Sequence, residues 1–180
     1  MSAIAEVLVA HGYRITGSDS QKSRVTDHLE DIGVKVYEGH SGKNIPNDTD
    51  ILVYSSAVKD DNPERIEAKR RGLVIVRRAE MLAELMLMKY GIGIAGTHGK
   101  TTTTALTSMA LIEAGLDPTV IIGGKVKALG GNNARVGKGN HIIVEADEYD
   151  RTFLSLTPNI ALITTLEEDH LDCYESLSDI

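Results

Sequence analysis

The sequence has little of what secreted or membrane-anchored proteins use. Its one cysteine, Cys173, excludes an internal disulfide and fits a reducing compartment. The N-terminal segment MSAIAEVLVA carries Glu6 and no basic region, unlike a secretory signal peptide. The most apolar stretch, Met81–Met88, contains Glu84 and is too short to cross a bilayer. These absences predict a cytoplasmic protein without a membrane span.

Basic charge is also scarce, because 19 Lys and Arg residues stand against 26 Asp and Glu residues, giving a net charge of −7. Proteins that bind nucleic acid usually present a basic face, so DNA, RNA and anionic membranes are disfavoured as partners. The acidic residues gather late in the chain: from Asn140 onward there are ten Asp or Glu residues and one Arg. Such a gathering is either a solvated surface or a cation site.

Hydrophobic residues make up 42% of the 180 residues, enough for a core in one domain or two small ones. Short β-like runs alternate with helical stretches, and the pattern restarts near Tyr90, which predicts parallel βαβ units and an α/β fold. Helices are predicted at Ser2–His11, Gln21–Ile32, Pro63–Arg71, Ala79–Lys89 and Lys100–Ala114. Strands are predicted at Tyr13–Thr16, Val34–Tyr37, Asp50–Tyr54, Leu73–Val76, Gly91–Ala95, Thr119–Ile122, His141–Val144 and Ile160–Thr164, with an excursion or hairpin at Gly123–Gly139.

The strongest motif is GIAGTHGKTTTT, residues 93–104, placed between a predicted strand and a predicted helix. In this setting loop N–H groups bind phosphate oxygens, a lysine reaches the terminal phosphates, and the next hydroxyl ligates magnesium. Gly96 and Gly99 would allow the tight turn, Lys100 would supply the cation and Thr101 the hydroxyl. The general pattern has glycine at position 94, where this chain has isoleucine. The alternative is a Gly- and Thr-rich helix start that binds no ligand.

Acidic side chains follow the next two apolar strands. Glu145 comes directly after the run IIV, and His170 lies in the segment LEEDHLD after the later strand. The carboxyl ends of parallel strands meet at one edge of a sheet, so both segments should approach the phosphate loop. Magnesium prefers oxygen ligands, and a second cation can accept a histidine nitrogen. We therefore expect Glu145 and His170 to be metal ligands. Four other acidic residues are explained at least as well as solvated loop residues: Asp147, Glu148, Glu167 and Glu168.

Several segments, in order, resemble the Mur ligase family: GTHGKTTTT, EAGLDPT, NARVGKG, VEADEYDRTFL and DHLD. YSSAVKDDNPE and RRAEMLAELM resemble the uridine-nucleotide domain of that family, and the resemblance covers essentially the whole chain. It implies a Rossmann-like domain lacking its first strand at residues 1–89, which binds UDP-N-acetylmuramate. Part of a P-loop, parallel-sheet ATP-binding domain follows at residues 90–180. We expect the chain to be truncated at both ends.

The resemblance implies an ATP-dependent ligase of peptidoglycan biosynthesis. GTHGKTTTT together with EADEYD is most similar to the members that add L-alanine to UDP-N-acetylmuramate, with ATP and Mg²⁺ required. ATP would convert the muramoyl carboxylate, a poor electrophile, to an acyl phosphate with a good leaving group. The alanine amine would then form the amide, releasing ADP and phosphate. We expect the 180 residues alone to be inactive, because the rest of the family's domains are needed.

The resemblance also implies residue roles. The ATP phosphate site would comprise Gly96, Thr97, His98, Gly99, Lys100, Thr101 and Thr102. Metal would be held by Thr101, Glu145 and His170, and the catalytic set would be Lys100, Glu145 and His170. Asp19 would contact the uridine moiety. The family often reads T-N-x-x-x-D-H, but Thr165 stands where Asn is expected, so one polar contact near the nucleotide is not carried over.

Three other functions stay open. One is the recycling ligase of the same family, which joins a preformed tripeptide to UDP-N-acetylmuramate and shares GTHGKT and EADEYD. Another is a P-loop kinase or other phosphotransferase, which would need a hydroxyl-acceptor site that no segment marks. The last is a non-catalytic nucleotide-binding module. The segments AEMLAELM and YSSAVKDDNPE favour the L-alanine enzyme over the tripeptide enzyme.

Overall fold

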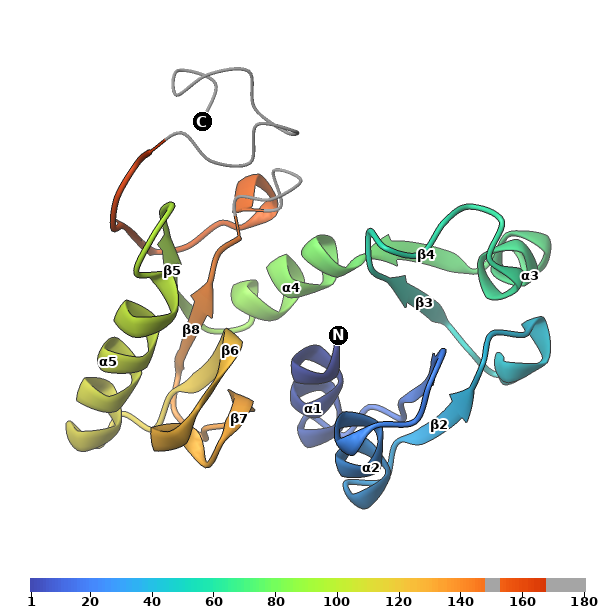
Figure 1. The fold of residues 1–180 in the computed structure, drawn as a ribbon, viewed down its shortest axis with the longest axis horizontal. Helices are drawn as coiled ribbons and strands as arrows, with labels where there is room; N and C mark the ends of the chain where they lie inside the picture. The colour runs from blue at the N-terminus through green and yellow to red at the C-terminus, as the bar shows by residue number, and fades with distance from the viewer. Residues whose placement is uncertain (148–152, 168–180) are drawn as a thin grey trace. The chain divides into compact units, whose positions relative to one another are not determined.

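The computed structural model describes residues 1–147 and 153–167 (Figure 1). The chain divides into two compact units, Met1–Met81 and Leu82–Ile180. Both units alternate helices and strands, which confirms the expected α/β class. Among the helices described, none has the length and apolar character needed to cross a membrane.

The first unit contains short helices and four short strands. In chain order its elements are α1 (Ser2–Ala10), β1 (Thr16–Asp19), α2 (Arg24–Asp31), β2 (Lys35–Glu38), η1 (Gly42–Asn44), β3 (Ile51–Tyr54), α3 (Pro63–Arg71) and β4 (Val74–Arg77). Helix α4 (Arg78–Leu87) begins in the first unit and ends in the second.

The strands of the first unit form two parallel pairs, β1 with β2 and β3 with β4. In a doubly wound sheet the first strand is central, the second and third strands lie on one side, and the fourth and fifth lie on the other. The two observed pairs are these outer pairs when α1 is taken as the first crossover helix. The pairing therefore fits the Rossmann-like domain expected from the sequence.

The first predicted strand was placed three residues too early. Tyr13–Thr16 carries the apolar side chains, but the observed strand is Thr16–Asp19, which pairs in register with Lys35–Glu38. Gly, Ser and Asp are poor strand formers, so pairing with β2 overrides local propensity here. The shift places Asp19 at the last position of the strand.

Helix α3 begins and ends where the sequence predicts. Asn62 caps its N-terminus by accepting hydrogen bonds from the N–H groups of Glu64 and Arg65, and Pro63 occupies the first turn. Gly72 ends the helix in the left-handed conformation, with φ of 67°.

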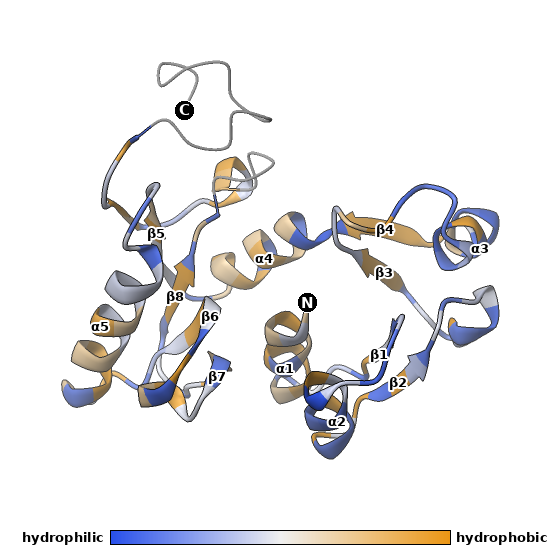
Figure 2. Ribbon diagram, viewed as in Figure 1, coloured by the Kyte–Doolittle hydropathy of each residue, from blue (hydrophilic) through white to orange (hydrophobic). Residues whose placement is uncertain are grey.

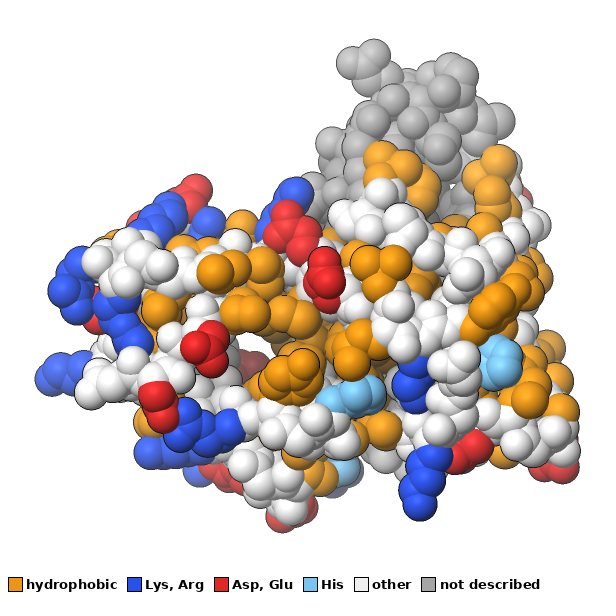
Figure 3. All heavy atoms as spheres, turned by 180° about the vertical axis from the view of Figure 1, so that it is seen from behind, with side chains coloured by type: hydrophobic (Ala, Val, Ile, Leu, Met, Phe, Trp, Pro, Cys, Tyr) orange, Lys and Arg blue, Asp and Glu red, His pale blue; other side chains and the backbone are white. Residues whose placement is uncertain are grey.

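The basic residues of α3 lie beside acidic ones. Arg65 and Lys69 both pair with Asp60, at 2.7 and 3.2 Å, and Arg70 pairs with Glu67 at 2.7 Å. Figure 3 shows the same interspersion of Lys and Arg with Asp and Glu side chains on the face that it draws. Positive charge on this helix is therefore locally compensated.

The second unit is built on one five-stranded sheet, in the order β7-β6-β8-β5-β9. Its elements are β5 (Tyr90–Ala95), α5 (Lys100–Glu113), β6 (Thr119–Val126), η2 (Lys127–Leu129), β7 (Asn132–Arg135), β8 (His141–Glu145) and β9 (Ile160–Ile163). Strands β6, β8, β5 and β9 are parallel, and β7 is antiparallel to β6. The excursion predicted at Gly123–Gly139 is therefore a hairpin, made by the extended end of β6 and by β7.

The core of the second unit lies between this sheet and α5. Buried side chains come from β5, β6, η2 and β8: Ile92, Ile94, Val120, Ile122, Leu129 and Ile143. Partly buried residues of α5 pack against them, among them Met109 and Ile112. Figure 2 shows β8 as one of the more hydrophobic strands, as expected for a strand paired on both sides in a parallel sheet.

Lys89 fixes the loop that leads into β8. Its ammonium group donates hydrogen bonds of 2.9 Å to the Thr119 hydroxyl and to the carbonyls of Gly137 and Gly139. Burial lowers the pKa of Lys89, and the nearby Asp117 carboxylate opposes that shift. Three acceptors for three N–H donors satisfy the ammonium group completely.

Replacing Lys89 by methionine should destabilise the second unit. The substitution keeps most of the side-chain volume but removes three hydrogen bonds, to the Thr119 hydroxyl and to the carbonyls of Gly137 and Gly139. We expect a loss of about 1–3 kcal/mol in the free energy of unfolding, measured by urea denaturation followed at the amide signals of β8. The same change at the exposed Lys138 is the control and should have little effect; equal losses would contradict this role for Lys89.

Candidate functional site

The predicted phosphate loop connects β5 to α5. Ile94, at the position where the general pattern has glycine, is fully buried in β5 and pairs with both β8 and β9. The loop therefore starts only at Gly96, whose φ is 124°, and ends at Gly99, whose φ is 80°. Position 94 belongs to the core of the sheet, so the departure from the general pattern lies outside the loop.

Lys100 begins α5 and folds back over the loop. Its ammonium group donates to the carbonyl oxygens of Gly96, at 2.7 Å, and Thr97, at 3.2 Å. The first N–H groups of a helix have no acceptor within the helix, so Lys100, Thr101 and Thr102 present donors at this end of α5. A loop of this shape with a lysine at its end is suited to phosphate oxygens.

The carboxylate of Glu145 connects three elements at the carboxyl edge of the sheet. One of its oxygens accepts a hydrogen bond of 2.8 Å from the Thr101 hydroxyl, and the other accepts one of 2.7 Å from the N–H group of Gly123. Glu145 ends β8, Thr101 lies in the first turn of α5, and Gly123 lies in β6. Two oxygen ligands of the kind that Mg²⁺ prefers therefore lie side by side next to the loop.

The segment after β9, residues 164–167, contacts the phosphate loop on its other side. The N–H group of Thr97 donates to the carbonyl of Thr165 at 2.8 Å, and the N–H group of His98 donates to its hydroxyl at 3.1 Å. The buried hydroxyl of Thr97 exchanges two hydrogen bonds with the backbone of Glu167. Thr164 donates from its hydroxyl to the carbonyl of His98 at 2.5 Å.

Three of the segments expected to converge therefore do so. The loop, the end of β8 and the segment after β9 lie together because β5 pairs with both β8 and β9. His170 and Glu168 lie outside the described residues, as do Glu148 and Cys173. Within residues 1–147 and 153–167, no group of three or more His, Cys, Asp or Glu side chains is arranged to hold a metal ion. Of the predicted metal ligands, Thr101 and Glu145 are those that the structure brings together.

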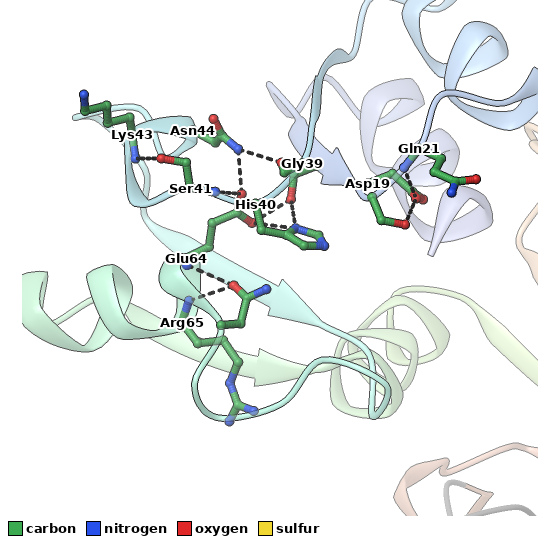
Figure 4. Close-up of polar contacts among 12 residues, drawn as sticks. Asp19, Gln21, Gly39, His40, Ser41, Lys43, Asn44, Glu64 and Arg65 are labelled. Carbon is green, nitrogen blue, oxygen red and sulfur yellow. Dashed lines mark hydrogen bonds and ion pairs between the residues drawn. The ribbon is translucent and has the colours of Figure 1, made fainter.

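Asp19, the residue predicted to contact uridine, is exposed at the carboxyl end of β1 (Figure 4). Its carboxylate accepts a hydrogen bond of 3.3 Å from the N–H group of Gln21, and its carbonyl accepts one of 2.7 Å from Gly39. Its role in binding stays a prediction.

Next to Asp19 lies a polar cluster centred on Glu64 (Figure 4). The carboxylate of Glu64, whose side chain is only 13% exposed, accepts hydrogen bonds from Ser18 at 2.6 Å and from Asn44 at 2.8 Å. The ring of His40 lies 2.9 Å from the Ser18 hydroxyl. This cluster joins the end of β1 to α3 within the first unit.

Sequence reasoning did not single out Glu64, Ser18 or His40. Ser18 and Glu64 are 46 residues apart, and only the fold brings them together. The one available signal was the position of Glu64 at the end of YSSAVKDDNPE, a segment that resembles the uridine-nucleotide domain.

Comparison with known proteins identifies the family. Residues 1–90 match the model of the Mur ligase family catalytic domain, and residues 94–180 match that of the Mur ligase middle domain. The chain belongs to the Mur ligase family. Among curated Mur ligases, it is 56% identical over 181 residues to the UDP-N-acetylmuramate–L-alanine ligase of Salinibacter ruber and 52% identical over 180 residues to that of Geotalea daltonii. Both alignments include the whole of this chain, which spans 38% and 39% of the length of these two relatives.

Solved Mur ligase structures share the fold. The UDP-N-acetylmuramate–alanine ligase of Thermotoga maritima superposes with a TM-score of 0.89 at 32% identity, covering 99% of this chain and 42% of that one. The UDP-N-acetylmuramate:L-alanyl-γ-D-glutamyl-meso-diaminopimelate ligase of Neisseria meningitides gives 0.86 at 28% identity, covering 99% of this chain and 60% of that one. The α/β architecture deduced from the sequence is therefore that of Mur ligases.

Replacing Gly96 by alanine should disrupt the loop. A Cβ at this position would overlap the Thr164 hydroxyl and lie 2.8 Å from the carbonyl of Thr165, and φ at Gly96 is one that L-residues rarely adopt. We expect a loss of about 1–3 kcal/mol in the free energy of unfolding of the second unit, measured by urea denaturation. Gly17→Ala in β1 is the control, because a Cβ there meets no atom within 4 Å. A Gly96→Ala protein as stable as the parent would contradict this packing.

Proposed function

We propose that this chain is part of a Mur ligase that uses ATP to join L-alanine to UDP-N-acetylmuramate. The observation that carries the proposal is the pairing of Thr101 with Glu145 directly beside the phosphate loop, at 2.8 Å. A hydroxyl and a carboxylate placed in this way, next to a lysine and a set of helix N–H groups, suit a nucleotide triphosphate bound with a divalent cation.

The phosphate loop would bind the terminal phosphates of ATP. Lys100 reaches from α5 back over the loop, so its ammonium group would exchange the carbonyls of Gly96 and Thr97 for phosphate oxygens. The N–H groups at the start of α5 would donate to the same phosphates. Together these donors would oppose the negative charge that develops during phosphoryl transfer.

Mg²⁺ fits the two oxygen ligands supplied by Thr101 and Glu145, with waters and phosphate oxygens completing its coordination. When bound, it would neutralise phosphate charge and favour the leaving of ADP. The hydrogen bond from Gly123 to the second oxygen of Glu145 fixes the orientation of the carboxylate. We propose His170 as the residue near a second cation, on the basis of the DHLD motif.

The ligase chemistry follows from the weak electrophilicity of a carboxylate. Transfer of the γ-phosphoryl group to the muramoyl carboxylate releases ADP and gives an acyl phosphate. The amine of L-alanine then attacks the acyl carbon, the C–O bond to phosphate breaks, and the amine loses a proton as the amide forms. The residues of this chain contribute positioning and charge stabilisation to the first of these steps.

We propose that residues 1–89 form the domain that binds UDP-N-acetylmuramate and residues 90–180 the ATP-binding domain. Asp19, exposed at the carboxyl end of β1, would contact the uridine moiety there. The carboxyl ends of strands are the usual ligand edge of doubly wound sheets, which supports this assignment.

The sequence identities favour L-alanine over the wall tripeptide as the second substrate. The chain is 56% identical to a curated relative named for L-alanine addition. Among solved structures, it is 32% identical to the Thermotoga alanine ligase and 28% identical to the Neisseria enzyme named for the tripeptide. The tripeptide enzyme remains the second candidate because its structure superposes with a TM-score of 0.86.

Replacing Lys100 by alanine should weaken binding of Mg-ATP to the 180-residue chain. Loss of a charged donor to phosphate should raise the dissociation constant roughly 10- to 100-fold, measured by calorimetric titration. Lys138→Ala is the matched control, because Lys138 precedes β8 and so lies toward the amino edge of the sheet. Equal affinities of the parent and Lys100→Ala proteins would contradict the nucleotide site.

The choice of substrate is tested in the full-length ligase that we propose contains this chain. With Mg-ATP and UDP-N-acetylmuramate present, we expect ADP release to depend on L-alanine. The 180-residue chain alone should show no such turnover. Release only with the tripeptide would move the assignment to the recycling ligase, and release with neither would favour a nucleotide-binding module.

A further inference from the structure

The phosphate loop is held from outside by the segment after β9, residues 164–167. Seven hydrogen bonds join this segment to residues 95–98, and they involve both backbone and side chains. They are Thr164 N–H to Ala95 O, Thr164 Oγ1 to Ala95 O and to His98 O, Thr97 N–H to Thr165 O, His98 N–H to Thr165 Oγ1, Thr97 Oγ1 to Glu167 O, and Glu167 N–H to Thr97 Oγ1.

These contacts divide the donors of the loop into two sets. The N–H groups of Thr97 and His98 both point to Thr165, at 2.8 and 3.1 Å. The N–H groups from Gly99 onward lie at the start of α5, where the helix offers no acceptor. The first set is therefore bonded within the protein, and the second set begins the helix, where phosphate oxygens are commonly bound.

Thr165 accepts these two N–H groups with two different oxygen atoms, that of its carbonyl and that of its hydroxyl. Its carbonyl accepts from Thr97, as any residue at this position could, but only a side chain with an acceptor can bind the N–H group of His98. His98 is the last residue before the turn at Gly99, so its orientation fixes the direction in which α5 begins. Loss of the Thr165 hydroxyl would leave the backbone register intact and free this one donor.

We propose that Thr165 is a positioning residue for the nucleotide: its hydroxyl holds the N–H group of His98 so that the donors from Gly99 onward face the phosphates before any ligand binds. This proposal rests on the proposed function for its nucleotide, but the hold on His98 is a property of the chain alone. A preorganised loop binds phosphate without first ordering its own backbone, which improves affinity.

The hydrogen bond from the N–H group of His98 to the Thr165 hydroxyl is tested without any ligand. Amide hydrogen exchange of His98 should be slowed in the parent chain and should accelerate about fivefold in Thr165→Val, which keeps the shape of the side chain and loses the acceptor. Thr165→Ser, which keeps the hydroxyl, should restore protection. Thr157→Val, at an exposed position, is the control for the substitution itself. Unchanged exchange of His98 in Thr165→Val would overturn the proposal.

The role in positioning is tested with Mg-ADP. We expect Thr165→Val to raise the dissociation constant about fivefold with an unchanged unfolding temperature, and Thr165→Ser to restore the affinity of the parent. Faster exchange of His98 with unchanged affinity for Mg-ADP would overturn the positioning role. If the parent chain itself does not bind Mg-ADP, the proposed nucleotide site fails, and the exchange result alone then decides whether Thr165 holds the loop.

Discussion

The hydrogen bond between Thr101 and Glu145 is the interaction on which the candidate site depends. It joins the first turn of α5 to the end of β8, and the bond from Gly123 adds β6 to the same carboxylate. Hydrogen bonds to a charged group contribute about 1.5–3 kcal/mol, roughly twice a neutral one. Glu145 thus holds three elements in place, and in the proposed function the same carboxylate would supply an oxygen ligand to Mg²⁺.

This arrangement is possible because β5 is paired on both sides. Its partners β8 and β9 run parallel to it, so the segments that follow all three strands meet at one edge of the sheet. The phosphate loop then lies between Glu145 on one side and residues 164–167 on the other. Ile94 of β5 is fully buried and pairs with both of these strands. A substitution there would therefore disturb the part of the sheet that positions the loop.

The sequence predicted most of the fold of both units and the main parts of the site, because each left a local signal. Gly72 and Pro63 marked the ends of α3, and the GTHGKT segment marked the loop. Features set by pairing were harder to predict: β1 falls three residues later than its apolar pattern suggests, because register with β2 decides its position. Contacts between distant residues, such as Glu64 with Ser18 and His98 with Thr165, could not be predicted as pairs, because only the fold brings the partners together.

A nucleotide site at this edge of the sheet requires that the donors at the start of α5 and the carboxylate of Glu145 receive one ligand together. The most direct measurement is a titration of the isotopically labelled chain with Mg-ADP, followed by amide chemical shifts. We expect the largest changes at residues 99–102 and at Gly123, whose N–H group donates to Glu145. Changes of that size confined to other parts of the chain, or none at saturating Mg-ADP, would contradict the assignment of this edge of the sheet as a nucleotide site.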